Sequence, residues 1–246
     1  MTFIRSILFF TFLVLSTIVI AGLASIFGWF LPLQTRFFIS NAWSRVNLAA
    51  LTLLCGLNYR IDGLNNIPDD KSVIILSKHQ SAWETIAFLS IIPLNKAWVL
   101  KQELLRVPIF GWALRLFKPI ALDRKAGRKA VVQLIRDGTE RLESGLSVMI
   151  FPEGTRVAPG AHKRYGIGGA LLAEKSGFPV LPVSHNAGVF WKRRGINKHP
   201  GTIDVRVGPL IETEGLDANE INAKVEAWIE GTLEALPQER KVTGDR

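Results

Sequence analysis

The chain has 246 residues, of which 48% are apolar and 21% are charged, and it carries a formal net charge of +9. The apolar content excludes a disordered chain, and the single cysteine excludes a disulfide framework and zinc sites built from two or four cysteines. The length suits one catalytic or binding unit with an appendage.

The first feature along the chain is an apolar segment without charge. Arg5 and Arg36 bracket 30 uncharged residues, 6–35. A helix of this length would measure about 45 Å, against about 30 Å for the hydrocarbon core of a bilayer. It would either span with tilt or break near Gly22, Gly28 or Pro32 and enter one leaflet. A cleaved signal peptide is the alternative, but its apolar region is normally about 7–15 residues long. We therefore predict a retained apolar helix over residues 6–33.

A second apolar stretch follows, interrupted by polar residues. Trp43, Val46, Ala50 and Leu53 recur at about helical spacing, which predicts an amphipathic helix over residues 37–57. Such a helix lies at the membrane interface or packs on the first helix. The apolar part ends near residue 60, so we expect a membrane anchor over residues 1–58 and a second domain over residues 59–246. The only cysteine, Cys55, is expected to be a small buried side chain.

Short apolar runs alternate with helical patterns in the second domain. Strands are predicted over residues 73–76, 97–100, 119–122, 147–151, 179–183 and 203–207, and helices over 83–90, 108–117, 127–143 and 168–175. A last helix is predicted after Asp217, which has Glu220 three residues on, as in a capping box. This alternation predicts an α/β fold with a mixed, mostly parallel sheet flanked by helices.

The positive charge is concentrated in the middle of the chain. Residues 96–206 contain 20 Lys or Arg against 8 Asp or Glu, whereas residues 207–246 contain 4 against 9. A face of this kind attracts anionic partners, namely nucleic acid, anionic lipid or a phosphorylated substrate.

A histidine and a carboxylate, His79 and Glu84, follow the strand predicted at 73–76. Within one helix, residues five apart diverge by about 140°, so the two side chains can meet only if His79 precedes the helix and Glu84 lies in its first turn. A carboxylate bonded to one ring nitrogen fixes the tautomer, and the other nitrogen can then accept a proton from a hydroxyl group. Read alone, a histidine and a glutamate at this spacing are more often two ordinary surface residues.

Two further groups of polar residues follow predicted strands. Glu153, Gly154, Thr155 and Arg156 come after the charge-free strand at 147–151. Glycine allows a ligand to approach the backbone, and arginine suits bidentate recognition of phosphate. Lys101 and Arg124 are cations that follow the strands at 97–100 and 119–122. The carboxyl ends of strands are where sites gather in open α/β sheets, although each group alone also fits a polar turn or a solvated face.

Taken together, these segments resemble the 1-acyl-sn-glycerol-3-phosphate acyltransferase family. The resemblance covers roughly residues 60 to 210. Residues 79–84 are similar to the family's His-x₄-Asp block, 101–111 to its Lys-x-Glu-Leu block, 121–124 to the end of that region, and 180–183 to its apolar block ending in proline. Residues 151–156, Phe-Pro-Glu-Gly-Thr-Arg, match the corresponding family block at every position. The chain departs from the family in having Glu84 instead of Asp, and in having Lys78 where many members have Asn.

The resemblance implies transfer of a fatty acyl group to the sn-2 hydroxyl of lysophosphatidic acid, which gives phosphatidic acid. The donor would be acyl-CoA or acyl carrier protein, used as a co-substrate, with no cofactor and no metal. His79 is implied as the general base and Glu84 as its partner. Lys101 and Arg156 are implied to bind the phosphate, Glu153 and Gly154 are implied to place the glycerol, and Arg124 and Thr155 complete the expected binding residues. A thioester is already activated, so we expect direct attack without an acyl-enzyme, and Ser81 is better explained as a turn or cap residue.

The lipid substrate and the apolar N-terminus together predict a membrane location. Acyl thioesters are cytosolic, which favours the cytoplasmic side of a bacterial inner membrane, and Arg36, Arg45 and Arg60 agree with that orientation. Two alternatives remain at this point: an acyltransferase for another lysolipid, such as an ornithine lipid, and a non-catalytic adaptor that binds anionic lipid. A nucleic-acid partner is not expected, because no nucleic-acid motif accompanies the basic residues.

Overall fold

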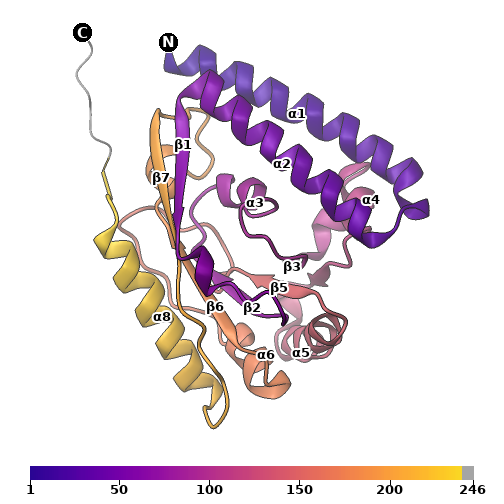
Figure 1. Ribbon diagram of the computed structural model, residues 1–246, viewed down its shortest axis with the longest axis vertical. Coiled ribbons are helices and arrows are strands. Elements are labelled where there is room, and N and C mark those ends of the chain that lie inside the picture. Colours follow the sequence, from indigo (N-terminus) through magenta and orange to yellow (C-terminus); the bar gives the residue numbers. More distant parts are fainter. Residues whose placement is uncertain (240–246) are drawn as a thin grey trace.

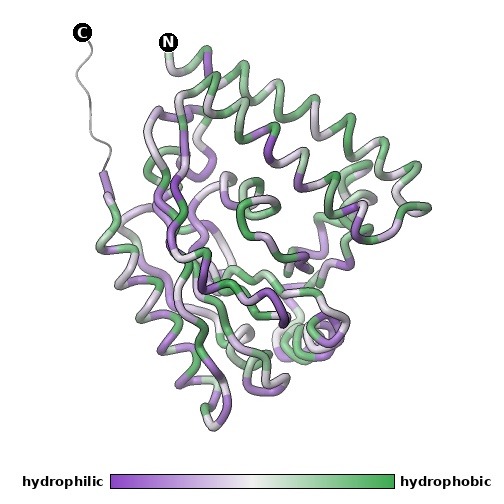
Figure 2. Tube along the Cα trace, in the orientation of Figure 1, coloured by the Kyte–Doolittle hydropathy of each residue, from purple (hydrophilic) through white to green (hydrophobic). Residues whose placement is uncertain are grey.

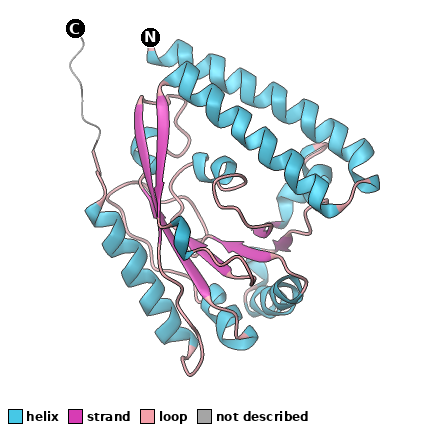
Figure 3. Cartoon of the chain, viewed as in Figure 1, coloured by secondary structure: helices cyan, strands magenta, loops and turns pink. Residues whose placement is uncertain are grey.

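A seven-stranded sheet forms the centre of the computed structural model, which describes residues 1–239 (Figure 3). The strands are β1 (Leu57–Asp62), β2 (Ile74–Ser77), β3 (Lys96–Lys101), β4 (Ile120–Leu122), β5 (Ser147–Ile150), β6 (Val180–His185) and β7 (Gly201–Val207). Their order is β1-β7-β6-β2-β5-β3-β4, and every neighbouring pair is parallel except β6 and β7. The predicted mixed, mostly parallel sheet is confirmed.

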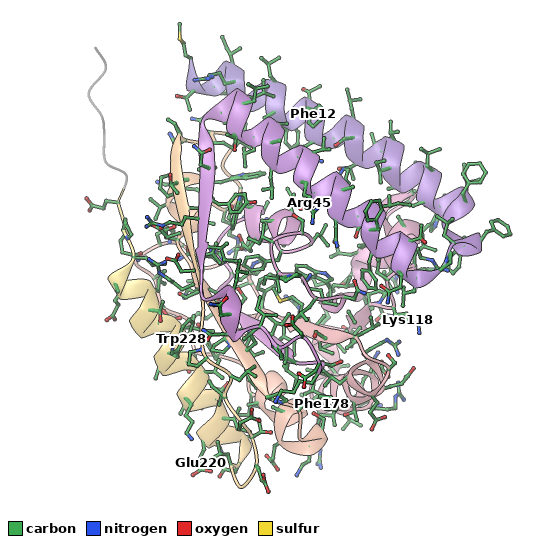
Figure 4. The ribbon with its side chains drawn as sticks, viewed as in Figure 1. Phe12, Arg45, Lys118, Phe178, Glu220 and Trp228 are labelled. Atoms are coloured by element: carbon green, nitrogen blue, oxygen red, sulfur yellow. The ribbon has the colours of Figure 1, made fainter. Side chains whose placement is uncertain are left out.

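Helices cover both faces of this sheet (Figure 1). They are α1 (Thr2–Phe27), α2 (Leu33–Cys55), α3 (Trp83–Ala87), α4 (Phe110–Arg115), α5 (Arg128–Glu143), α6 (Gly168–Ser176), α7 (Ala187–Phe190) and α8 (Ala218–Ala235). One core joins the sheet to α1, α2 and α3, and a second core joins it to α5, α6 and α8. Figure 4 shows the two sides, with Phe12 on α1 and Trp228 on α8. Strands β2, β5 and β6 are buried along their whole length, because they lie in the middle of the sheet with helices on both sides.

The N-terminal apolar segment breaks at Gly28, one of the positions at which a break was expected, and does not continue as one helix to residue 33. Helix α1 ends at Phe27, a short 3₁₀ turn follows at Gly28–Phe30, and Pro32 precedes the first residue of α2. Proline suits this position because its nitrogen carries no hydrogen to leave unpaired. Most apolar side chains of α1 are exposed. Figure 2 shows that the residues of this helix are mostly hydrophobic.

Helix α1 is attached to the α/β domain near both of its ends. The backbone N–H of Lys198 donates to Oγ of Ser6 at 2.8 Å, and Oγ of Ser25 donates to the carbonyl of Ile109 at 3.1 Å. Helix α2 packs along α1 and is bonded to α3 through Ser44, whose Oγ donates to the Ile86 carbonyl. The helical pair therefore lies along one side of the domain.

Several element boundaries differ from the sequence predictions. Helix α2 ends at Cys55 because Gly56 adopts the left-handed conformation (φ 67°), and Leu57 begins an unpredicted edge strand, β1. Helix α3 ends at Ala87 instead of residue 90. Helix α4 begins at Phe110 instead of residue 108, after Ile109, which has φ 64°. The short helix α7 was also not predicted. Cys55 is buried and free, as expected.

The predicted start of the last helix is confirmed. Asp217 accepts hydrogen bonds from the backbone N–H groups of Asn219 and Glu220, and the Glu220 carboxylate accepts the Asp217 N–H at 2.9 Å. These reciprocal bonds form the capping box and satisfy donors that the first turn would leave unpaired.

Candidate active site

The candidate site lies at one edge of the sheet. Strands β2, β5, β3 and β4 are consecutive parallel neighbours, so their carboxyl ends meet at the same edge. The segments that leave this edge begin at residues 78, 151, 102 and 123. They contain seven of the eight site residues predicted from the sequence, and the eighth, Lys101, is the last residue of β3.

His79 and Glu84 are in contact, because the first lies in the loop after β2 and the second in the first turn of α3. Nδ1 of His79 lies 2.9 Å from Oε1 of Glu84. The same oxygen accepts the backbone N–H groups of Gln80 and Ser81 at 2.8 and 2.7 Å. These donors fix the carboxylate, so the extra methylene of glutamate relative to aspartate is accommodated.

The contact assigns the protons of the histidine. Burial raises the pKa of Glu84, but His185, His79 and the Ser81 N–H act in the opposite direction and hold that pKa below its ordinary value. An ionised carboxylate only accepts hydrogen bonds, so Nδ1 of His79 carries the proton and donates it. Nε2 then has a free lone pair, as a general base requires.

The imidazole of His79 is held on several sides. Its ring stacks on Phe151 with centroids 3.9 Å apart and an angle of 12° between the planes. The backbone N–H of His79 donates to Oε2 of Glu153 at 2.7 Å, and its carbonyl accepts the N–H of Val157 at 2.8 Å. The side chain is 14% exposed, so one part of the ring reaches the surface.

A buried ion-pair network lies beneath the histidine. Nζ of Lys78 is 2.7 Å from Oε1 of Glu153 and 2.7 Å from Oε1 of Glu230 on α8, and the side chains of Lys78 and Glu153 are 0% exposed. The Tyr165 hydroxyl donates to the same Glu230 oxygen at 2.7 Å. Burial raises the pKa of Glu153 to about 7, although Lys78 favours the ionised form. Glu153 therefore positions the histidine through its backbone N–H, and the buried Glu153 carboxylate is not accessible to a substrate.

The predicted cations lie at or after the carboxyl ends of three strands, β3, β4 and β5. Arg156 precedes Val157, whose backbone is bonded to that of His79, and its half-exposed side chain makes no hydrogen bond or ion pair within residues 1–239. Arg124 reaches from the end of β4 to the Gly154 carbonyl, which joins the two loops. Lys101 is exposed at the end of β3. Thr155 is half-exposed beside Arg156.

Two contributors to the site were not predicted from the sequence as functional residues. Glu230 is distant in the chain and lies on a helix whose pattern indicated only packing. His185, at the end of β6, is fully buried and its pKa is lowered by that burial. The Ala187 N–H donates to its Nδ1 at 3.2 Å, so Nε2 carries the proton, which is donated to the Lys78 carbonyl at 2.9 Å. The sequence did contain one indication of this ion-pair network, because Lys78 follows a buried strand directly.

Two further possibilities within residues 1–239 are Ser81 as a nucleophile and a group of side chains that could bind a metal ion. Ser81 is buried, and its Oγ accepts the Trp83 N–H at 3.1 Å, as a turn residue would. Within residues 1–239, no group of three or more His, Cys, Asp or Glu side chains is arranged to hold a metal ion.

Comparison with known proteins places the chain among related sequences. The family model described as Acyltransferase matches residues 58–186. A 1-acyl-sn-glycerol-3-phosphate acyltransferase of Pseudomonas aeruginosa is 43% identical, over 98% of this chain and 95% of the relative. The alpha enzyme of that name from Mus musculus is 28% identical, over 73% of this chain and 64% of the relative. The structure also superposes on the crystal structure of the 1-acyl-sn-glycerophosphate acyltransferase PlsC from Thermotoga maritima, over the full length of both chains. The TM-score is 0.74 and the sequence identity is 24%, which shows a shared fold.

Proposed function

This chain belongs to the acyltransferase family and is a 1-acylglycerol-3-phosphate O-acyltransferase, and from that membership we propose the reaction and the roles of its residues. A fatty acyl group passes from acyl-CoA or acyl carrier protein to the sn-2 hydroxyl of lysophosphatidic acid, and the product is phosphatidic acid. The observation that carries the mechanism is the 2.9 Å contact between His79 and Glu84.

His79 acts as the general base. Nε2 takes the proton of the sn-2 hydroxyl as its oxygen attacks the thioester carbonyl carbon, and Glu84 stabilises the imidazolium that forms. The new C–O bond is retained when the tetrahedral intermediate collapses and the C–S bond breaks. The imidazolium then returns its proton to the departing thiolate. Atoms and charge balance without a protein nucleophile, and the buried Ser81 and Cys55 support a path without an acyl-enzyme.

The phosphate of the acceptor binds to the cationic rim of the site. Arg156 is the principal contact in this proposal, because its guanidinium has no other partner within residues 1–239 and its neighbour is bonded to the His79 backbone. Arginine binds phosphate through two parallel hydrogen bonds. Lys101 and Arg124 add positive charge along the same edge, and Thr155 lies beside the phosphate. Glu153 and Gly154 act by holding the loops, since the Glu153 carboxylate is engaged by Lys78 and His79.

Residues 1–58 form the membrane anchor. The segment Thr2–Phe30 is long and apolar enough to cross a bilayer, and most of its apolar side chains are exposed. A perpendicular helix of 26 residues, about 39 Å long, would put its two ends on opposite sides of the hydrocarbon core. Both Ser6 and Ser25 are bonded to the same α/β domain, so α1 lies along the membrane surface with its exposed side in one leaflet. The catalytic domain is on the cytoplasmic side of a bacterial inner membrane, where acyl thioesters are made.

A single assay tests this function. The full-length protein in detergent micelles is incubated with labelled acyl-CoA or acyl carrier protein and a panel of lysolipids that includes lysophosphatidic acid and lyso-ornithine lipid. Labelled phosphatidic acid formed in preference to the other products supports the proposal, and the faster donor identifies the co-substrate. If only the ornithine lipid is labelled, the acceptor is lyso-ornithine lipid and not lysophosphatidic acid. If no lysolipid is acylated, the result favours a non-catalytic role in binding anionic lipid.

A further inference from the structure

A basic loop that follows β6 and α7 lies beside the N-terminal end of α1. This basic loop comprises residues 192–199, Lys-Arg-Arg-Gly-Ile-Asn-Lys-His, with four Lys or Arg and no acidic residue. Ile196 projects from it and is 53% exposed. A turn closed by the bond from the Gly195 N–H to the Lys192 carbonyl, at 2.9 Å, holds the exposed part of the loop.

The basic loop is joined to α1 at its base. Lys198 is buried, its backbone N–H donates to Oγ of Ser6, and its ammonium lies 5.7 and 5.2 Å from the ring centroids of Phe9 and Phe10. These contacts fix the loop against the helix, so the loop and the exposed face of α1 meet a membrane together. Figure 1 shows this loop, between α7 and β7, close to the N-terminus.

The basic loop is also joined to the candidate active site. Nη1 of Arg193 donates to the backbone carbonyl of Arg156 at 3.0 Å. The loop thus contacts both α1 and the segment that binds phosphate in the proposed mechanism. One hydrogen bond therefore joins the loop to the site, and another joins it to α1.

A surface hollow of about 420 Å³ opens between the basic loop and α1. It is lined by Phe3 of α1 and by loop residues that include Lys192, Arg194, Ile196 and Asn197. Two cations, an amide and two exposed apolar side chains thus surround one space, whose volume is in the range of small-ligand sites. Phosphate suits the cations, and acyl or glycerol carbon suits the apolar pair.

We propose that this hollow binds the phosphate headgroup of an anionic phospholipid in the bilayer, while Phe3 and Ile196 enter the interface. The proposal rests on the membrane anchor proposed above and adds a headgroup site whose lining includes none of the proposed catalytic or phosphate-binding residues. Charge complementarity selects the occupant, because the basic loop contains no acidic residue and anionic lipid concentrates cations at its surface. Continuity with the exposed apolar side of α1 selects the bilayer as its source.

The test measures binding of the full-length protein to vesicles by flotation. One set of vesicles contains phosphatidylcholine alone, and the other contains phosphatidylcholine mixed with phosphatidylglycerol. The variant K192Q/R194Q removes two charges from the hollow. The matched control K129Q/K224Q removes two exposed charges on α5 and α8, on the opposite face of the sheet. Circular dichroism establishes that each variant is folded.

We expect the affinity of K192Q/R194Q for the anionic vesicles to be lower by roughly tenfold or more. Its affinity for the neutral vesicles should equal that of the unchanged protein. The control should bind both sets normally, and Ile196→Asp should weaken binding to both. Turnover of lysophosphatidic acid in detergent should stay unchanged in K192Q/R194Q, which separates this result from a failure of the proposed function. Equal binding of K192Q/R194Q and the control to anionic vesicles would overturn the proposal. A raised KM for acyl carrier protein with normal vesicle binding would also overturn it and would assign the loop to an acidic protein.

Discussion

Nζ of Lys78 lies 2.7 Å from Oε1 of Glu230, although the two residues are 152 positions apart in the chain. The contact joins α8 to the residue directly before the candidate base. Glu153 completes the connection, because it pairs with Lys78 and accepts the backbone N–H of His79. The orientation of His79 therefore depends on a helix on the opposite face of the sheet.

Removing Lys78 should destabilise the protein and slow the reaction. Lys78→Met leaves Glu153 buried without its cation, which typically costs about 3–5 kcal/mol. The loss should be larger at pH 8 than at pH 6, because a Glu153 whose pKa is already near 7 takes up a proton more readily at the lower pH. Urea unfolding at both pH values measures this, with Lys224→Met, at an exposed position of α8, as the control. K78M/E153Q should recover part of the stability, and a loss equal to the control's would contradict the network.

Replacing the candidate base should abolish turnover without unfolding the protein. His79→Ala should lower kcat by about 10²–10⁴-fold, the usual contribution of a general base. Glu84→Gln should lower kcat more than it raises KM, because the carboxylate stabilises the imidazolium that exists only during the reaction. Steady-state kinetics with saturating acyl-CoA measures both variants. His79→Ala turnover close to that of the unchanged protein would remove His79 as the base.

The local part of this site is predictable from the sequence, and the distant part is not. His79 and Glu84 are five residues apart, so strand and helix patterns alone indicate whether they meet. No local pattern connects Lys78 with Glu230, or His185 with the loop after β2. Their contacts depend on how β6 and α8 pack against the sheet, which sequence periodicity does not specify.

The fold shows the same division between local and distant information. Strands β2 and β5 are short, uncharged and fully buried, so their composition identifies them. Strand β1 lies at the edge of the sheet, and its sequence Leu-Asn-Tyr-Arg-Ile-Asp alternates apolar and polar residues, a strand pattern that the prediction overlooked. Its parallel pairing with β7, more than 140 residues later, is the part that no local pattern specifies. The predicted helix at 108–117 is longer than α4, because the backbone conformation of Ile109, with φ 64°, determines where the helix begins.

The Glu84 carboxylate should make the free energy of unfolding decrease as the pH falls into the acid range. Its pKa in the folded state lies below its ordinary value, so its contribution to stability is fully present above the unfolded-state pKa of about 4.3. That contribution is lost as the pH falls through the lower folded-state pKa. Unfolding free energies of the unchanged protein and of Glu84→Gln, measured between pH 3 and pH 7, should therefore differ most near neutrality and converge in acid. A difference that grows as the pH falls would contradict the sign of the shift.

Arg156 should affect the affinity for the phosphorylated acceptor. Arg156→Ala should raise the KM for lysophosphatidic acid by roughly tenfold or more, since a charge-assisted hydrogen bond contributes about 1.5–3 kcal/mol. The KM for the acyl donor should change little. Arg136→Ala, at an exposed position on α5, is the matched control. If Arg156→Ala saturates normally while Lys101→Ala or Arg124→Ala does not, the phosphate contact belongs to those residues instead.

The exposed apolar side of α1 should determine membrane binding. Deleting residues 1–58 is a poor test, because Phe9, Leu51 and Cys55 are part of the core shared with the sheet. Leu8→Glu combined with Leu15→Glu changes two side chains that are 54% and 58% exposed, and it should release the protein from neutral vesicles in flotation. Val132→Glu, at a 59% exposed position on α5, should leave binding unchanged.

The orientation of α1 can be tested separately with cysteine labelling. In a Cys55→Ser background, Thr2→Cys and Gln34→Cys place single thiols at positions that flank most of the apolar segment. A helix that lies along the surface leaves both positions on one side, so a membrane-impermeant maleimide should label both in sealed inside-out membrane vesicles and neither in intact spheroplasts. Labelling of the two positions from opposite sides would show that α1 spans the bilayer, and the bonds of Ser6 and Ser25 to a single domain would then require another explanation.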